Sequence, residues 1–235
     1  MKKFVAIAAS AALLSGMAQY SFAEKASKSK VDERLTDAGA VLNEIMAAPD
    51  KGIPQEILAG AHCVIVVPGF KKAAFVVGGE YGQGVGTCRT ARGWSAPVMV
   101  QLAGGSFGFQ IGAQSTDLVL LGMNQNSLQD MLKSKVKIGA NASAAAGPVG
   151  RDAAAGTDWK LNSEFLTYSR SKGLFAGIDL SGSVLSQNTE DTRTEYGSDV
   201  PFEKVLNGGV PTPVSARPFV RTVAKYFVSA KKAQD

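Results

Sequence analysis

Apolar residues recur at helical spacing between residues 31 and 48, with acidic side chains off that face. The recurring positions are Val31, Leu35, Ala38, Leu42, Ile45 and Met46. This period predicts an amphipathic helix with one buried face. Pro49 and Gly52 are expected to end it. A second, shorter helix is predicted over residues 53–58, because Pro54 lies in its first turn.

The pattern then changes to that of strands. Residues 64–67 and 74–77 are apolar runs that Pro68-Gly69 separates, which predicts two strands joined by a turn. Gly82, Gly84 and Gly86 alternate, so they share one face of a strand and leave its backbone bare. We expect another layer of the same protein to pack closely against that face.

The rest of the chain continues this mixture and predicts an α+β fold. Further strands are expected over 94–102, 106–113, 117–122, 136–146, 165–168 and 174–185. A helix is predicted over 124–132, with Asn126 or Ser127 as its cap, and a last helix over 218–232. Residues 187–198 are predicted to be an exposed polar loop or a solvated edge, and 201–213 a connector. Short connections favour a mainly antiparallel sheet, sandwich or barrel-like, with amphipathic helices at both ends.

The first 23 residues are typical of a cleaved secretory signal peptide. Lys2 and Lys3 precede an apolar run over 4–18, and Ser21 and Ala23 are the small residues before the expected cut. Polar residues interrupt the run, which argues against a membrane anchor. The sequence therefore predicts an exported protein, periplasmic or secreted, that is soluble or peripherally attached to a membrane. Residues 24–30 would form a flexible start, 31–190 the main domain, and 191–235 a polar loop, a connector and a basic helix.

Charge and cysteine content narrow the function. Loss of Lys2 and Lys3 reduces the formal charge from +5 to +3, which is too mild to indicate nucleic-acid binding. Cys63 and Cys88 are the two cysteines, and an oxidising compartment permits a disulfide between them. Two small buried hydrophobic residues are the other interpretation, because the sequence does not give their separation.

Catalytic and metal-binding patterns are weak. Residues 104–108 read Gly-Gly-Ser-Phe-Gly, but a serine-hydrolase elbow needs a strand that turns into a helix and a histidine later in the sequence. The one histidine, His62, precedes Ser106. One histidine and two cysteines are too few for a zinc or copper site, and the carboxylates lack the spacing of calcium loops. We expect no catalytic residues, no metal and no cofactor.

Surface cations remain as the candidate chemistry. The last helix carries a basic stripe beside an apolar face, a pattern typical of a helix that lies on an anionic membrane. The stronger interpretation is a helix docked on a sheet with a charged outer face, because any such helix requires an apolar face. Two predicted hairpin tips carry further cations. The candidate lipid-binding residues are Lys71, Lys72, Arg89, Arg92, Arg217, Arg221, Lys225 and Lys232.

Four ordered blocks resemble the SYLF domain family, also called the yeast actin-binding domain. They are 61–68 with 78–84, then 107–114, then 136–150, then 171–177 with 180–183, and together they lie within 31–187. The resemblance implies a non-enzymatic lipid-binding module. Eukaryotic members bind phosphoinositides, including phosphatidylinositol lipids, and organise actin at membranes. Here a signal peptide replaces their membrane-inserting amino terminus, so the chain is similar to exported bacterial members and actin is not expected as its partner.

The sequence thus leaves two hypotheses. The first is an exported protein that binds anionic lipid or envelope surfaces through basic residues on loops and on the last helix. The second is a structural envelope protein that binds a protein partner, without a lipid ligand, through its glycine-faced sheet and the polar segment over 187–198.

Overall fold

The computed structural model describes residues 2–47, 52–133, 135–147, 163–171, 174–176 and 180–232. The predicted α+β class is confirmed. The elements are α1 (Lys2–Ala47), α2 (Gln55–Gly60), β1 (Cys63–Thr90), β2 (Gly93–Trp94), β3 (Val98–Gly122), α3 (Gln125–Leu132), β4 (Lys135–Lys137), β5 (Ala144–Ala146), β6 (Phe165–Ser171), β7 (Leu174–Ala176), β8 (Val184–Gln187), α5 (Thr189–Tyr196), α6 (Phe202–Leu206) and α7 (Arg217–Lys232).

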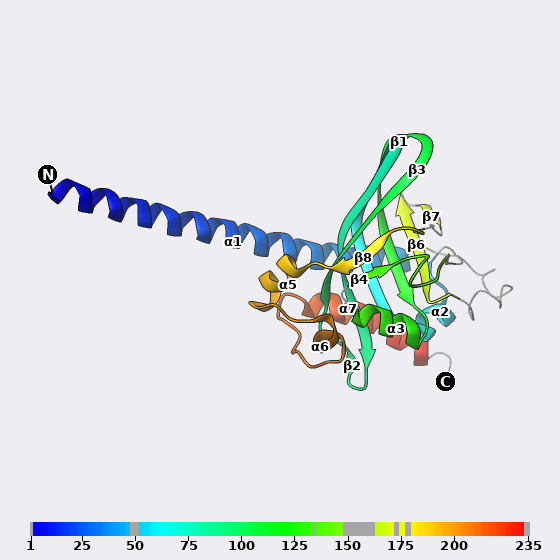
Figure 1. Cartoon of the computed structure of the whole chain (residues 1–235). Coiled ribbons are helices and arrows are strands. Elements are labelled where there is room, and N and C mark those ends of the chain that lie inside the picture. Colours follow the sequence, from blue (N-terminus) through cyan, green and yellow to red (C-terminus); the bar gives the residue numbers. More distant parts are fainter. Residues whose placement is uncertain are drawn as a thin grey trace.

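A long antiparallel ribbon of β1 and β3 dominates the sheet and bends back on itself (Figure 1). Its pairing runs from Cys63 opposite Gly122 to Gly86 opposite Val98. The prediction of separate short strands was wrong. Pro68 and Gly69, the latter at φ 58°, form an irregularity inside β1 rather than a hairpin turn. Pairing resumes on both sides of such a bulge, because only the local register changes.

The bend divides the ribbon into two limbs. The first limb contains residues 63–67 of β1 paired with 118–122 of β3, and the second contains residues 82–86 of β1 paired with 98–102 of β3. The remaining strands extend both limbs into a curled, mostly antiparallel sheet. β8 lies beside residues 100–103 of β3 and carries β4 on its other side. β6 lies beside residues 117–122 of β3, with β7 antiparallel to it and β5 parallel to it. The sheet therefore has the shape of a half-barrel, which agrees with the predicted barrel-like arrangement.

The bend presses one limb of β1 onto the other. A Cβ atom at Gly84 would lie 2.2 Å from the carbonyl oxygen of Val66, and one at Gly82 would lie 2.6 Å from a methyl of Val67. The expectation that another layer of the protein packs on this glycine face is confirmed. The layer is the first limb of the same strand.

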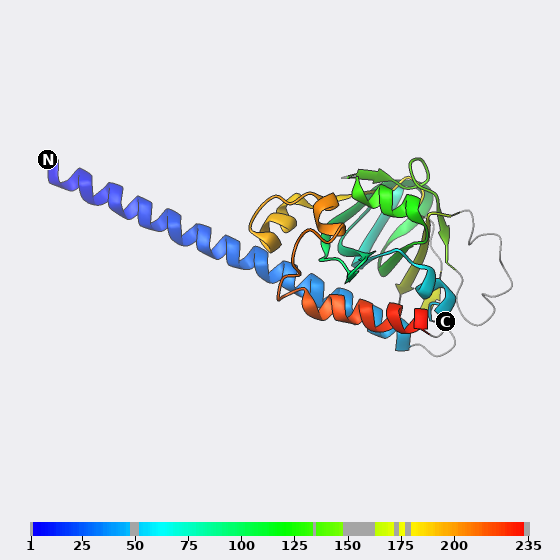
Figure 2. The same ribbon diagram turned by 90° about the horizontal axis from the view of Figure 1, so that it is seen from below.

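Two hydrophobic cores lie on opposite faces of the first limb. Val64 and Val66 pack with the helices α1, α2 and α7, whereas Ile65 and Val67 point into the half-barrel toward α3 and α6. Figure 2 shows α1 and α7 side by side along one side of the sheet, where Tyr226 donates a hydrogen bond to Asn43. Both faces of this segment are therefore buried, as its unbroken apolar sequence indicates.

Several helix predictions need correction. Asn124, not Asn126, caps α3, because its side chain accepts the amide of Ser127 while Ser127 accepts the amide of Asn124. Residues 187–198 are not an exposed loop, since α5 forms there with Asp191 and Glu195 buried. The predicted connector over 201–213 contains α6. Among the described residues, no helix is long and apolar enough to cross a membrane.

Candidate functional site

Lys71 and Lys72 do not lie at a hairpin tip, because β1 continues through them. Lys71 is exposed. Lys72 forms an ion pair with Glu80, 2.8 Å between Nζ and Oε2, and its ammonium lies 5.9 Å from the ring centroid of Phe70. Glu80 is buried and also accepts a hydrogen bond from Ser183. Lys72 thus balances an internal carboxylate, which leaves Lys71 as the cation of this pair that faces outward.

Arg89 joins three elements from inside the protein. Its guanidinium donates to the carbonyl oxygens of Ala61 at 2.7 Å, Phe227 at 3.1 Å and Leu58 at 3.3 Å. It also lies 4.9 Å from the ring of Trp94. Burial lowers the pKa of Arg89, but a guanidinium stays protonated in proteins. Arg89 therefore ties the ends of α2 and α7 to β1 and is a structural residue.

Replacement of Arg89 by Met should destabilise the fold by about 2 to 4 kcal/mol, because it leaves several carbonyl groups without a charged donor. Arg89→Lys should rescue little, since an ammonium cannot reproduce the guanidinium fork. Urea unfolding measures both. Arg221→Gln, an exposed change on α7, is the control and should stay within about 0.5 kcal/mol of wild type. Equal stability of R89M and R221Q would contradict the structural role.

The helix α7 presents cations on the side away from the core. Its apolar side chains Phe219, Val223, Phe227 and Ala230 are buried in the core that the sheet shares with α1 and α2, which agrees with a helix docked on the sheet. Arg217, Arg221 and Lys225 are exposed. At about 100° per residue these three and Val228 lie within an arc of about 80°. The side chain of Lys232 lies outside the described part of the structure.

This surface, Arg217, Arg221 and Lys225 with the exposed Val228, is named the α7 stripe. Val214, 73% exposed, precedes it, and Val228 is 38% exposed. The sequence of α7 contains no acidic residue. Like charges four residues apart destabilise a helix by a few tenths of a kcal/mol per pair. An anionic partner on this surface would offset that repulsion.

Arg92 lies at the tip of the hairpin between β1 and β2, as the sequence predicted. It donates a hydrogen bond to the carbonyl of Gly208, 2.9 Å away. Trp94 packs on Phe227 of α7, with ring centroids 5.2 Å apart. The hairpin, the loop over 208–212 and α7 are therefore adjacent. Arg92 is therefore bound to the loop that leads to α7, whereas Lys72 and Arg89 contact groups of the protein itself.

The two cysteines are bonded. A disulfide joins Cys63 at the start of β1 to Cys88 near its end, beside the hydrogen bond from the amide of Arg89 to the carbonyl of His62. The bond holds the two limbs of β1 together at the base of the ribbon.

Ser106 and His62 are the residues that hydrolase or metal chemistry would use. Ser106 lies inside β3 opposite Gly78, so the strand-to-helix turn of a nucleophile elbow is absent there. The pKa of His62 is lowered by burial and by the positive charges of Arg89 and Lys231. Within the described ranges, no three metal-ligating side chains come together.

Sequence reasoning missed a buried charge network between α1 and α5. Arg34 pairs with Asp191 and donates to Gln83 at 2.7 Å, and Lys28 pairs with Glu195. A signal for α5 was present: Asn188 caps its start, and Gly197, at φ 71°, ends it. The long-range pairing partners could not be predicted, because they lie more than 150 residues away in the chain.

Comparison with known proteins identifies the family. A family model described as Ysc84, Las17-binding protein actin regulator, matches residues 103–226. An SH3 domain-containing protein of Schizosaccharomyces pombe is 35% identical over 175 residues, which are 73% of this chain and 40% of that protein. SH3 domain-containing YSC84-like protein 1 of Rattus norvegicus is 35% identical over 170 residues, 72% of this chain and 50% of its own length.

Protein YSC84 of Saccharomyces cerevisiae is 33% identical over 183 residues, 76% of this chain and 39% of its own length. This chain thus spans about half or less of the curated relatives it matches. The resemblance carried by the four sequence blocks is confirmed: the chain belongs to the Ysc84 family, the family of SYLF domains.

Proposed function

We propose that this protein is an exported, non-enzymatic binding module that associates with anionic lipid or envelope surfaces through the α7 stripe. The observation that supports it is the row of exposed cations Arg217, Arg221 and Lys225 on a helix without acidic residues. Each Lys or Arg at an anionic membrane surface contributes about 1 kcal/mol. Three of them favour weak, reversible and salt-sensitive attachment, and the exposed Val214 and Val228 add apolar contact at the two ends of the row.

The names of the relatives support a second candidate, a protein partner. They describe binding to Las17 and regulation of actin. For those proteins the names therefore indicate protein partners. An exported chain would need a different partner, which could use the same cationic surface if it were acidic. Lipid dependence distinguishes the two candidates, because only the first requires vesicles.

Co-sedimentation with vesicles tests the proposal. Binding should increase with the fraction of anionic lipid and decrease with salt, because exposed charges are screened beyond about 8 to 10 Å at physiological ionic strength. The triple variant R217Q/R221Q/K225Q should weaken binding roughly 100-fold, the sum of about 1 kcal/mol per cation.

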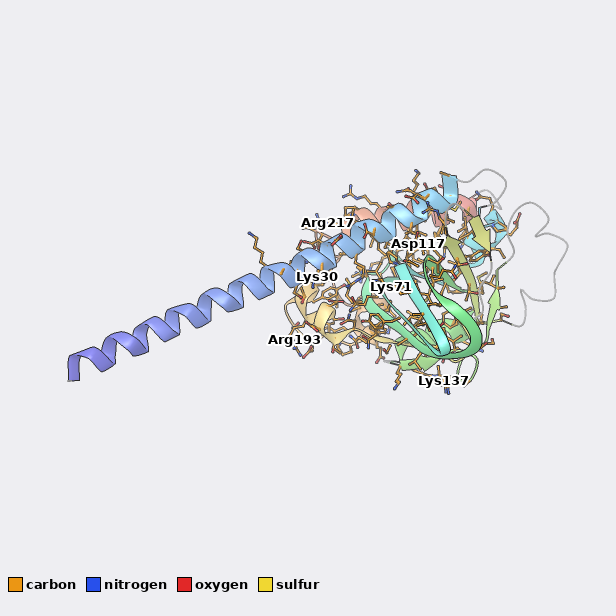
Figure 3. All side chains as sticks on the ribbon, turned by 90° about the horizontal axis from the view of Figure 1, so that it is seen from above. Lys30, Lys71, Asp117, Lys137, Arg193 and Arg217 are labelled. Carbon is orange, nitrogen blue, oxygen red and sulfur yellow. A yellow bond between two sulfur atoms is a disulfide. The ribbon has the colours of Figure 1, made fainter. Side chains whose placement is uncertain are left out.

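The matched control removes three cations elsewhere. K135Q/K137Q/R193Q lowers the net charge equally, and Figure 3 places Lys137 at the edge of the molecule opposite to Arg217 and Arg193 apart from Arg217 on α5. This control should retain most of the binding. Failure of the wild type to bind any anionic vesicle at low salt would sink the lipid proposal, and a lipid-independent complex from envelope extract would favour the protein partner.

A further inference from the structure

A cleft of about 370 Å³ opens between the β1–β2 hairpin and the loop from α6 to α7. Its walls are Thr90, Arg92, Trp94, Ser95 and Ala96 on the hairpin side and Gly208, Gly209, Val210, Pro211 and Thr212 on the loop side. This volume is in the range of sites that hold small molecules. None of the residues in the α7 stripe lines it.

The described lining of the cleft carries positive charge. Among the described residues that line it, Arg92 is the charged one and none is acidic. The hydrogen bond to Gly208 uses one of the five guanidinium N–H groups of Arg92. The indole N–H of Trp94 is buried without an acceptor among the described residues. An arginine with spare N–H groups, and no carboxylate among the described lining residues, suits an anionic group that is rich in acceptors.

Two adjacent glycines form part of the loop side of the cleft, and the backbone there requires them. Gly208 has φ 76°, a conformation that other residues rarely adopt, and a Cβ on it would approach Thr90 to 3.5 Å. Next to it, Gly209 leaves no room either, since a Cβ there would lie 2.9 Å from the carbonyl oxygen of Lys204. Gly208 thus leaves the space beside Arg92 free of a side chain, and the backbone of Gly209 packs closely on Lys204.

The cleft lies next to the helix α7. The chain that forms its loop side leads directly into α7, and Trp94 on the hairpin side packs against Phe227 of that helix. Figure 2 shows this loop and α7 on the same side of the molecule. Phe227 is buried, so the cleft adjoins the core side of α7 rather than the α7 stripe itself.

We propose that the cleft binds a single phosphate ester group, with Arg92 as its charged donor. This inference rests on the proposed function and deepens it: the stripe supplies long-range attraction and the cleft a specific headgroup contact. Guanidinium groups form strong, oriented hydrogen bonds to phosphate oxygens. The ester can come from a lipid headgroup or from a soluble phosphate.

Fluorescence of Trp94 reports on the cleft directly. The chain has two tryptophans, so Trp159→Phe leaves Trp94 as the sole reporter. Titration with glycerol 3-phosphate should give a saturable change, and glycerol should give none. Vesicles that contain phosphatidic acid form the second arm, and the arm with the lower midpoint identifies the source of the ester. In the same background, Arg92→Gln should weaken binding about 10-fold to 100-fold, the loss of a charged hydrogen bond.

The triple stripe variant keeps this test separate from the proposed function. In R217Q/R221Q/K225Q the glycerol 3-phosphate midpoint should shift much less than in R92Q, because these residues do not line the cleft. A thermal melt of R92Q that matches wild type shows that the fold is intact. No saturable response in either arm, or an equal response in R92Q, overturns the cleft proposal, while salt-sensitive vesicle binding would still support the stripe.

Discussion

Gly84→Ala should lower the free energy of unfolding by more than about 4 kcal/mol. This is a large share of the stability of a typical domain. Its Cβ would lie 2.2 Å from the carbonyl oxygen of Val66 and 2.9 Å from the Cα atom of Val67. Both are backbone atoms of a paired strand, so relief requires that the two limbs of the ribbon separate. Urea unfolding, followed by circular dichroism with the disulfide intact, measures the change.

Two other glycines make this prediction specific. At Gly82 the closest atoms are side-chain atoms of Val67 and Phe70, which can move, so Gly82→Ala should cost less than Gly84→Ala. At Gly79 nothing lies within 4 Å of the added atom, and Gly79→Ala should change stability by no more than about 1 kcal/mol. A G84A protein as stable as G79A would show that the limbs do not touch as described.

The alternating glycines illustrate what the sequence could predict. Period-two spacing of Gly82, Gly84 and Gly86 is a local pattern, and it correctly indicated a bare face with a close neighbour. Which segment would be that neighbour depends on a bend in a ribbon of two strands. The sequence interrupts that ribbon with Pro68-Gly69 and with Gly104-Gly105, and both pairs are signals for turns. The pairing of β1 with β3 across these positions is a long-range effect that overrides them.

The candidate site, too, could be predicted from the sequence only in part. The basic face of α7 and the hairpin position of Arg92 follow from local periodicity and turn residues. The structural role of Arg89 does not, because its acceptors come from α2 and from Phe227, which is 138 residues away. Charge alone cannot separate a cation that binds a ligand from one that binds the protein's own carbonyl groups.

The second large predicted effect concerns the buried ion pair between Arg34 of α1 and Asp191 of α5. Asp191→Ala should cost about 3 to 5 kcal/mol, because it leaves Arg34 buried without its counter-ion. The side chains of both residues are only 11% exposed. Asp191 also accepts a hydrogen bond from Asn188, and among the described residues Gln83 remains as a hydrogen-bond acceptor for Arg34 after the change. Unfolding in urea at neutral pH gives the difference.

Two further variants separate the buried charge from the loss of a surface contact. Asp199→Ala removes an ion pair with Arg193 whose side chains are 63% and 62% exposed, so it should cost less than about 1 kcal/mol. The double variant R34M/D191L removes both buried charges and should recover part of the stability lost in D191A, since no unpaired charge remains. If D191A were no more harmful than D199A, α5 would not be held to α1 by this pair. The segment over 187–198 would then behave as the solvated edge that its composition suggests.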